Sequence, residues 1–410
     1  MPVFTIYNCG TNFDESDGDK KGELIARMYK QTIGIRAEDK LICAGPGSTL
    51  MNRWGYDPAK EPADYKFSRL RVDKGIYQLF GEVKGDVGAK DQVKFNVNRV
   101  LEILKGLDPK PGTVNMAGWS RGACTCHAMA NAMDGDGDLS GVVVNIFAFD
   151  PVPGPERFGL KDWRIVPKNV ANYHAIFMEN ENRSLMNAAH LLFASRNTQR
   201  DLLHMPGSHS NAVQKETGFE EVAMVGGHLA AQSLRAWGTK FVLPTSFLRS
   251  DGELLEYYAR MIMKTKKFFE KGGDQIYRWT GSNQAWFKMP NHLLSKSPYF
   301  VNFHHKRVFK KVAPKVYKYF FEFQVFDETK SFDVYRETAV ERFAPDVTTG
   351  LELAQELDYL ESALPKTYET LHHFAKYVAK PRAKALKIEK KQKKEYGEYK
   401  TSLAAVFKAA

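Results

Sequence analysis

Residues 118–122, Gly-Trp-Ser-Arg-Gly, are the segment of the chain with the clearest potential for chemistry. They fit the pattern Gly-x-Ser-x-Gly, in which a serine on a sharp strand-to-helix turn attacks an ester carbonyl. The flanking glycines let the backbone approach itself closely. The backbone N–H of Arg121, at the start of a helix, is then placed to stabilise an oxyanion. We predict that Ser120 is a nucleophile; the alternative is a serine that only caps the helix.

A serine nucleophile needs a general base and an acidic group that orients the base. In α/β folds with this turn they follow in the order Ser, Asp, His. Asp150 directly follows the next apolar run, where it can orient an imidazole and stabilise its charged form. His209, in a Pro/Gly loop after Leu-Leu, is our candidate base. His174, His204 and His228 are alternatives that spacing alone does not exclude.

The elements that would position these residues alternate between strands and helices. Apolar or β-branched runs predict strands, and 3.6-residue periodicity predicts helices. The expected strands are 3–7, 41–44, 113–117, 142–149 and 172–178, and the expected helices are 22–30, 92–105 and 123–133. An almost wholly apolar run such as 142–149 is typical of a strand buried on both faces of a parallel sheet. We predict an α/β fold with a mostly parallel, α/β-hydrolase-like sheet.

Three other motifs are rejected as ligand sites. The acidic segment 134–139 lacks the glycine and glutamate that a calcium loop needs at its sixth and twelfth positions. Residues 124–127, Cys-Thr-Cys-His, lack the two spaced ligand pairs of a zinc site. Residues 45–49 lack the Gly-Lys-Ser/Thr ending of a phosphate loop. We expect no metal and no cofactor.

The charge distribution divides the 410 residues into two parts. The chain has a net charge of +11, but residues 1–263 are neutral overall because they hold equal numbers of acidic and basic residues. Residues 264–318 hold 13 Lys and Arg against 2 Asp and Glu, residues 319–375 are acidic, and residues 376–410 are basic. We predict a catalytic domain at 1–240 and a separate, mainly helical basic C-terminal module at 241–410.

Aromatic residues are interleaved with the basic residues of 264–318. This pattern suits an anionic membrane surface, where rings enter the interface and cations face the headgroups. It also suits a solvated basic face over the module's own aromatic core, or single-stranded nucleic acid. We expect the membrane surface as a partner through 264–318 and 376–410, with the solvated face as the alternative, and no nucleic acid.

Several ordered motifs resemble the phospholipase effectors of bacterial type VI secretion systems and related α/β hydrolases with a Gly-Phe-Ser-Arg-Gly-Ala turn. The matching segments are Gly118–Ala123, Cys9–Asn12 after the first strand, Phe149–Val152, His174–Ile176 with Glu179, Glu181 and Arg183, and Pro206–Asn211. The chain departs from the family at Cys9 and Asn211, where the family has aspartate. The resemblance covers about residues 1–237.

The resemblance implies a catalytic triad of Ser120, Asp150 and His209, and an oxyanion site at Arg121 and the Gly10-Thr11 turn. It implies a serine esterase that hydrolyses phospholipid acyl esters, as a phospholipase A does. The alternatives are a soluble carboxylesterase or thioesterase, and a membrane- or protein-binding effector with a vestigial hydrolase domain.

The first residues show no basic leader or apolar signal segment, and no apolar run reaches the ~20 residues that span a bilayer. Four cysteines are too few for a disulfide framework, so we expect reduced thiols. We therefore expect a protein made in the bacterial cytoplasm, exported without a classical signal peptide and associated with membranes of a target cell.

Overall fold

A computed structural model of the chain describes residues 2–20, 23–46, 85–153, 165–178, 191–205, 207–214, 219–249 and 303–312, together with isolated positions between 48 and 314. Its elements in chain order are β1 Val3–Asn8, α1 Asp17–Lys20, α2 Leu24–Gln31, β2 Lys40–Cys43, α4 Gly85–Gly106, β3 Thr113–Trp119, α5 Arg121–Asp134, β4 Val143–Phe149, β5 Ile165–Val166, β6 Val170–Met178, β7 Leu192–Phe193, β8 Gln199–Met205, η6 His209–Ala212, α6 Glu220–Ala236 and α9 Phe303–Val312.

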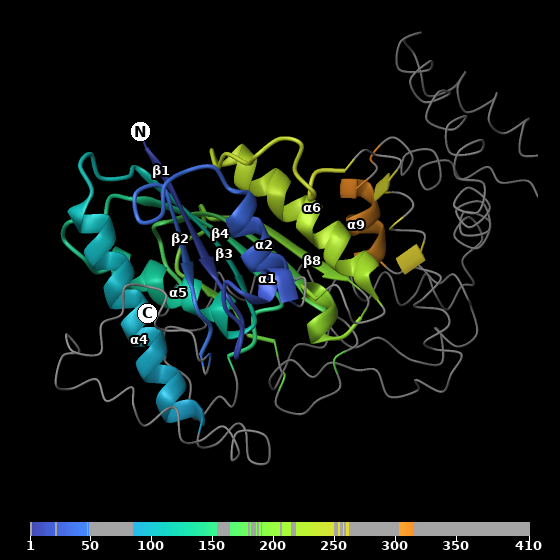
Figure 1. Cartoon of the computed structure of the whole chain (residues 1–410), viewed down its shortest axis with the longest axis horizontal. Helices are drawn as coiled ribbons and strands as arrows, with labels where there is room; N and C mark the ends of the chain where they lie inside the picture. The colour runs from blue at the N-terminus through green and yellow to red at the C-terminus, as the bar shows by residue number, and fades with distance from the viewer. Residues whose placement is uncertain are drawn as a thin grey trace, which may run out of the picture.

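Six strands form a parallel sheet in the order β2-β1-β3-β4-β6-β8 (Figure 1), and β5 and β7 form a small separate pair. The chain runs outward from β1 to β2 and then returns to place β3 on the other side of β1. In open α/β sheets, ligands bind outside the carboxyl ends of the strands where the strand order reverses. This reversal lies between β1 and β3. A ligand site is therefore expected beside the turns that follow Asn8 and Trp119, at the carboxyl ends of these two strands.

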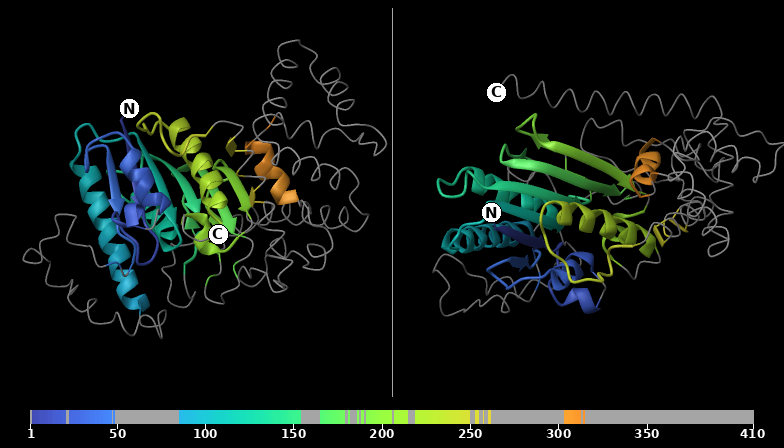
Figure 2. Two further views of the ribbon diagram at one scale, coloured as in Figure 1. Left: turned by 45° about the vertical axis from the view of Figure 1, so that its right-hand side comes forward. Right: turned by 90° about the horizontal axis from the view of Figure 1, so that it is seen from above.

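Both faces of the sheet are buried, because the strands carry apolar side chains on both sides. Helices α2 and α6 cover one face, and α4 and α5 cover the other (Figure 2). The first face buries Tyr7, Phe147, Phe149, Ile176 and Leu203, and the second buries Phe4, Ile6, Val114, Met116, Val144 and Ile146. The α/β class and the mostly parallel sheet that we predicted are therefore present.

Helix α6 was not among the predicted elements, and its close contact with the sheet depends on small residues. A Cβ at Gly226 would lie 3.2 Å from the Phe149 ring, and one at Gly227 would lie 3.0 Å from Leu24. Two adjacent glycines lower helix propensity, but here they let α6 approach both the sheet and α2. Gly226-Gly227 thus has a packing role.

A row of buried and half-buried amides crosses the sheet near the amino ends of three strands. The Asn172 amide donates to Asn145 at 2.7 Å, and the Asn145 amide donates to Asn115 at 2.9 Å. Asn115 in turn donates to Thr239 Oγ1 at 2.9 Å. Because each amide forms a hydrogen bond with the next, burying these polar groups costs little free energy. Their pairing also fixes the register of β3, β4 and β6.

Helix α9, from the segment predicted to belong to a separate module, packs against β8 at the end of the sheet (Figure 2). Val308 and Val312 join the buried cluster on the α6 face. Arg307 donates to the Leu202 carbonyl oxygen and pairs with Asp201 at 3.2 Å. The predicted division at residue 240 stays a prediction, and the blocks 319–375 and 376–410 lie outside the described residues.

No helix in the described ranges combines the length and apolar character needed to cross a bilayer. The four cysteines are free and buried. His127, which follows Cys126 on α5, has its Nε2 2.9 Å from the Tyr173 hydroxyl.

The N-cap of α2 is a fully buried carboxyl group, Glu23. Its Oε2 accepts from the Ala26 N–H at 2.7 Å, and its Oε1 has no hydrogen-bond partner among the residues that the structure describes. Burial raises the pKa of Glu23 to about 8, and the charge of Asp17 adds to this effect while that of Arg27 opposes it. The folded state therefore binds the Glu23 proton more tightly than the unfolded state does.

We predict that Glu23→Gln removes a pH-dependent loss of stability. Because the folded pKa is raised above its ordinary value of 4.5, the contribution of Glu23 is complete below about pH 4.5 and is lost as pH rises through about 8. Denaturant unfolding at pH 5, 7 and 9 should show the variant gaining relative to wild type as pH rises. Glu38→Gln at an exposed position is the control and should follow wild type. Parallel pH curves for Glu23→Gln and wild type would contradict this role.

Candidate active site

Ser120 lies on a sharp turn between β3 and α5 in a backbone conformation that L-residues rarely adopt, with φ 59° and ψ −129°. Two glycines make the turn possible. A Cβ at Gly118 would lie 2.6 Å from the Gly122 carbonyl oxygen, and a Cβ at Gly122 would lie 2.2 Å from the Asn8 carbonyl oxygen. Any larger residue at these positions would separate α5 from β1 or open the turn. The strained serine is thus held by contacts that surround it.

A chain of hydrogen bonds links the serine to a histidine and an aspartate. Ser120 Oγ lies 2.8 Å from His209 Nε2, and His209 Nδ1 lies 2.5 Å from Asp150 Oδ2. A carboxylate only accepts, so the proton of the neutral imidazole is on Nδ1. His209 Nε2 then accepts the Ser120 hydroxyl proton. This is the arrangement that a general base needs in order to activate a hydroxyl nucleophile.

Asp150 is fully buried directly after β4 and has a positive φ of 43°. Its Oδ1 accepts from the Met178 N–H at 3.0 Å at the end of β6, which leaves Oδ2 for His209. Its own N–H donates to the Ile176 carbonyl oxygen at 2.7 Å. The neighbouring strand therefore fixes both the carboxylate and the backbone of Asp150.

His209 begins the short helix η6, which two side chains hold in place. The Asn211 side-chain oxygen accepts from the Ser208 N–H at 2.7 Å and from its hydroxyl at 2.9 Å. The Glu181 carboxylate accepts from the His209 N–H at 3.0 Å, and Glu181 is itself buried. Asn211, which departs from the family pattern, thus has a local structural role beside the histidine.

The indole of Trp119 supports the imidazole of His209 from one side. The two rings are stacked with centroids 5.1 Å apart and planes 29° apart, and Trp119 Nε1 donates to the His209 carbonyl oxygen at 3.3 Å. Phe13 packs edge-on against Trp119 with centroids 5.0 Å apart. The residue before the serine therefore restricts how the His209 ring can turn.

The predicted oxyanion elements lie next to each other at the reversal of strand order. A Cβ at Gly10 would lie 2.4 Å from the Trp119 side chain, and a Cβ at Gly45 would lie 1.7 Å from the Gly10 carbonyl oxygen. Thr11 follows Gly10 on the same turn, and Arg121 opens α5 directly after Ser120. The structure thus brings the Gly10-Thr11 turn against the segment that carries Ser120.

The alternative histidines do not contact Ser120 where their side chains are described. His174 lies within β6, and its Nδ1 is 2.9 Å from Ser233 Oγ. His228, buried on α6, accepts from the Arg249 N–H at 3.1 Å. The side chain of His204 lies outside the described residues. Among the histidines whose side chains the structure describes, His209 is the one that pairs with both Ser120 and Asp150.

Sequence reasoning gave no role to Glu181 or Trp119. Glu181 is an acidic residue just beyond the carboxyl end of β6, and in a parallel sheet that end lies beside those of β4 and β8. The strand-end argument that selected Asp150 would also have pointed to Glu181. The stacking of Trp119 had no sequence signal, because its partner is far along the chain.

A scan of protein-family models and a search of curated proteins give no match for this chain. Among solved structures, it is similar to the crystal structure of an uncharacterized protein from Pseudomonas aeruginosa, with 13% identity and a TM-score of 0.36. The match covers 92% of this chain and 66% of that one. A likeness this distant carries no argument about function.

We predict that Glu181 positions His209. Glu181→Ala removes the acceptor of the His209 N–H and should slow labelling of Ser120 by a fluorophosphonate by about tenfold to a hundredfold, since such a bond contributes about 1.5–3 kcal/mol. Glu181→Gln keeps an acceptor oxygen and should recover most of the rate. Labelling kinetics and thermal unfolding of both variants give the measurement. Wild-type labelling by Glu181→Ala would contradict the positioning role.

Proposed function

We propose that the protein is a serine esterase of the α/β-hydrolase type that cleaves acyl esters of phospholipids. The observation that carries the proposal is the hydrogen-bonded chain from Ser120 through His209 to Asp150, with the serine on a strained strand-to-helix turn. The order of the three residues along the chain and their places at the carboxyl ends of parallel strands agree with that reaction class.

In the first half-reaction, His209 Nε2 accepts the Ser120 proton while Ser120 Oγ attacks the ester carbonyl carbon. Asp150 stabilises the imidazolium that forms. The backbone N–H groups of Arg121 and of the Gly10-Thr11 turn donate to the oxyanion of the tetrahedral intermediate. His209 then protonates the leaving alcohol oxygen, which for a phospholipid is the lysophospholipid, and an acyl-serine remains.

In the second half-reaction, His209 accepts a proton from water, which attacks the acyl-serine carbonyl. Collapse of the second tetrahedral intermediate breaks the bond to Ser120 Oγ, and His209 returns the proton to the serine. The products are a fatty acid and the free enzyme. Each proton transfer in the cycle therefore takes place through His209, to or from Ser120, the leaving alcohol or water.

The choice of phospholipid as substrate rests on the sequence resemblance. The half-buried aromatic ring of Phe13 near Trp119 is compatible with an acyl chain at the site. We further propose that the basic blocks 264–318 and 376–410 bring the enzyme to an anionic membrane. Of these blocks, the structure describes residues 303–312 and 314.

We predict that Ser120→Ala, His209→Ala and Asp150→Asn each lower ester hydrolysis by about 10⁴-fold or more, and that double variants lose little further activity. The three groups act on one proton and one bond, so their losses should not add. Ser140→Ala, an exposed serine, is the matched control and should keep wild-type activity. Activity above about a tenth of wild type in Ser120→Ala would reject Ser120 as the nucleophile.

The substrate class is tested with mixed phospholipid vesicles, comparing wild type with Ser120→Ala by lipid mass spectrometry. Release of paired lysophospholipid and fatty acid by wild type alone supports the proposal. Cleavage of short soluble esters or acyl thioesters without phospholipid hydrolysis would replace it by the carboxylesterase or thioesterase alternative. Failure of Ser120 to react with a fluorophosphonate would favour a vestigial hydrolase domain.

A further inference from the structure

The buried indole of Trp119 contacts two parts of the candidate site that would act on a substrate together. Its Nε1 donates to the His209 carbonyl oxygen at 3.3 Å, and its ring is stacked on the imidazole with centroids 5.1 Å apart. The benzene edge of the indole lies against Gly10, so closely that a Cβ at Gly10 would be 2.4 Å from Trp119 Cε3. One side chain therefore lies between the candidate base and the predicted oxyanion turn.

The surroundings of the indole leave it little freedom to move. Trp119 is the last residue of β3, and its backbone pairs with that of Phe149 on β4. Phe13 packs edge-on against the indole, with planes 76° apart, and the Phe13 N–H donates to the Gly10 carbonyl oxygen at 3.0 Å. A side chain enclosed in a close-packed interior turns only if its neighbours move. The indole is therefore a fixed surface beside the His209 imidazole.

This stacking bears directly on the two hydrogen bonds of the His209 ring. Nδ1 lies 2.5 Å from Asp150 Oδ2, and Nε2 lies 2.8 Å from Ser120 Oγ. Both nitrogens bond in the plane of the imidazole, so turning the ring would misalign both bonds. The indole, only 29° from parallel, blocks that turn on one side. Its face also attracts cations, which favours the imidazolium that forms when His209 accepts the serine proton.

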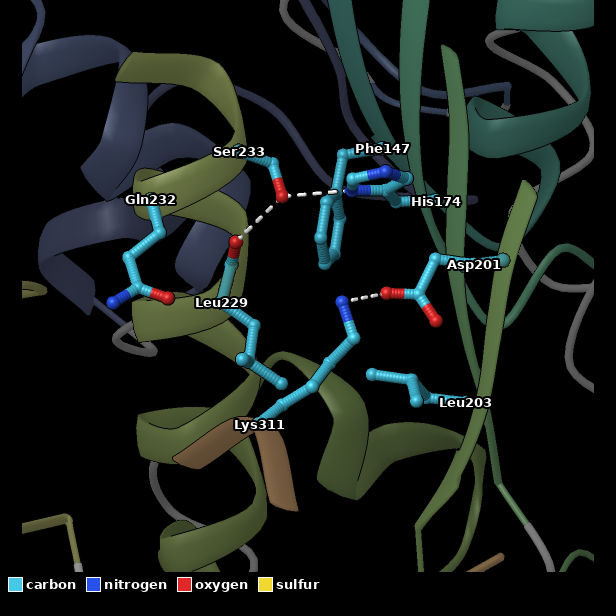
Figure 3. Close-up of a pocket in the computed structure, with 9 residues that line it drawn as sticks. Phe147, His174, Asp201, Leu203, Leu229, Gln232, Ser233 and Lys311 are labelled. Carbon is cyan, nitrogen blue, oxygen red and sulfur yellow. Dashed lines mark hydrogen bonds and ion pairs between the residues drawn. The ribbon is translucent and has the colours of Figure 1, made fainter. Parts of the chain in front are cut away.

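A second contact between a tryptophan and a histidine shows what the stacked geometry adds. The rings of Trp237 and His174 have centroids 4.9 Å apart, but their planes are 58° apart, so their faces do not lie against each other. His174 Nδ1 instead forms a hydrogen bond with Ser233 Oγ at 2.9 Å (Figure 3). Burial, and then the charge of Lys311, lower the pKa of His174 to about 4, so this imidazole is neutral at neutral pH. Trp237 is therefore a matched control for Trp119.

We propose that Trp119 is a positioning residue of the esterase reaction. Its indole fixes the plane of the His209 imidazole, so that the base is aligned with Ser120 and Asp150 at the same time. Through Gly10, the same ring sets the spacing between the base and the oxyanion turn. The effect on rate rests on the proposed function, whereas the effect on the His209 hydrogen bonds does not. A tryptophan that only filled space would stabilise the fold and leave these hydrogen bonds unchanged.

The test compares Trp119→Met, Trp119→Phe and the control Trp237→Met in the full-length protein. The two measured rates are labelling of Ser120 by a fluorophosphonate and solvent exchange of the His209 Nδ1 proton, followed by NMR with isotope-labelled histidine. Trp119→Met should slow labelling and speed exchange, each by about tenfold. Trp119→Phe keeps an aromatic face and should stay within about threefold of wild type in both rates. Trp237→Met should match wild type.

A wild-type rate of either process in Trp119→Met would overturn the proposal, even if the free energy of unfolding has fallen. Loss of the Nδ1 proton signal in folded Trp119→Phe would also overturn it. If the wild-type protein is not labelled, the proposed esterase function fails, and exchange of the His209 proton alone decides the positioning role. If Trp119→Met does not fold, Phe13→Leu replaces it. This change removes the half-buried ring that supports the indole and should speed exchange by about threefold, and unchanged exchange would overturn the proposal.

Discussion

The rest of the site depends on how closely the backbone approaches itself around Ser120. A residue with φ near 59° is strained by about 1–3 kcal/mol and persists only where its surroundings fix it. Gly122 packs on the carbonyl oxygens of Asn8 and Cys9, and Gly118 packs on Gly122, so β1, β3 and α5 are locked together at this one point. With α5 anchored there, the serine hydroxyl projects from the turn within reach of the His209 imidazole.

The other half of the site comes from neighbouring strands that end at the same edge. Asp150 follows β4, Glu181 follows β6 and His209 follows β8, and the two carboxylates both hydrogen-bond to His209, Asp150 to its ring and Glu181 to its backbone N–H. The Met178 N–H completes the set by fixing Asp150 Oδ1. Because these groups are buried, their dipoles and charges are held in place by the contacts around them. For the esterase that we propose, such preorganisation would be a main source of transition-state stabilisation.

The sequence predicted those features that local pattern determines. Apolar runs predicted β1, β2, β3, β4 and β6 but not β5, β7 or β8, and the place of Asp150 after a buried run predicted its position beside the His209 imidazole. The rest depends on distant partners: the His209 N–H meets Glu181 from 28 residues away, and Arg307 meets Asp201 from 106 residues away. Charge counting predicted a basic face, but it could not show that Arg307 and Lys311 turn towards a carboxylate of the sheet. Helix α6 was missed because its paired glycines, which weaken an isolated helix, are needed for its packing.

The contact between α9 and β8 has a consequence for how the chain is made. A ribosome releases β8 about 100 residues before it releases Val312, which at the usual 5–20 residues per second is about 5–20 s. During that interval the last strand of the sheet lacks the cover of Val308, Val312 and Arg307, and an uncovered edge strand can pair with other chains. The nascent chain therefore passes through a stage at which the edge of β8 lacks the cover that α9 later provides.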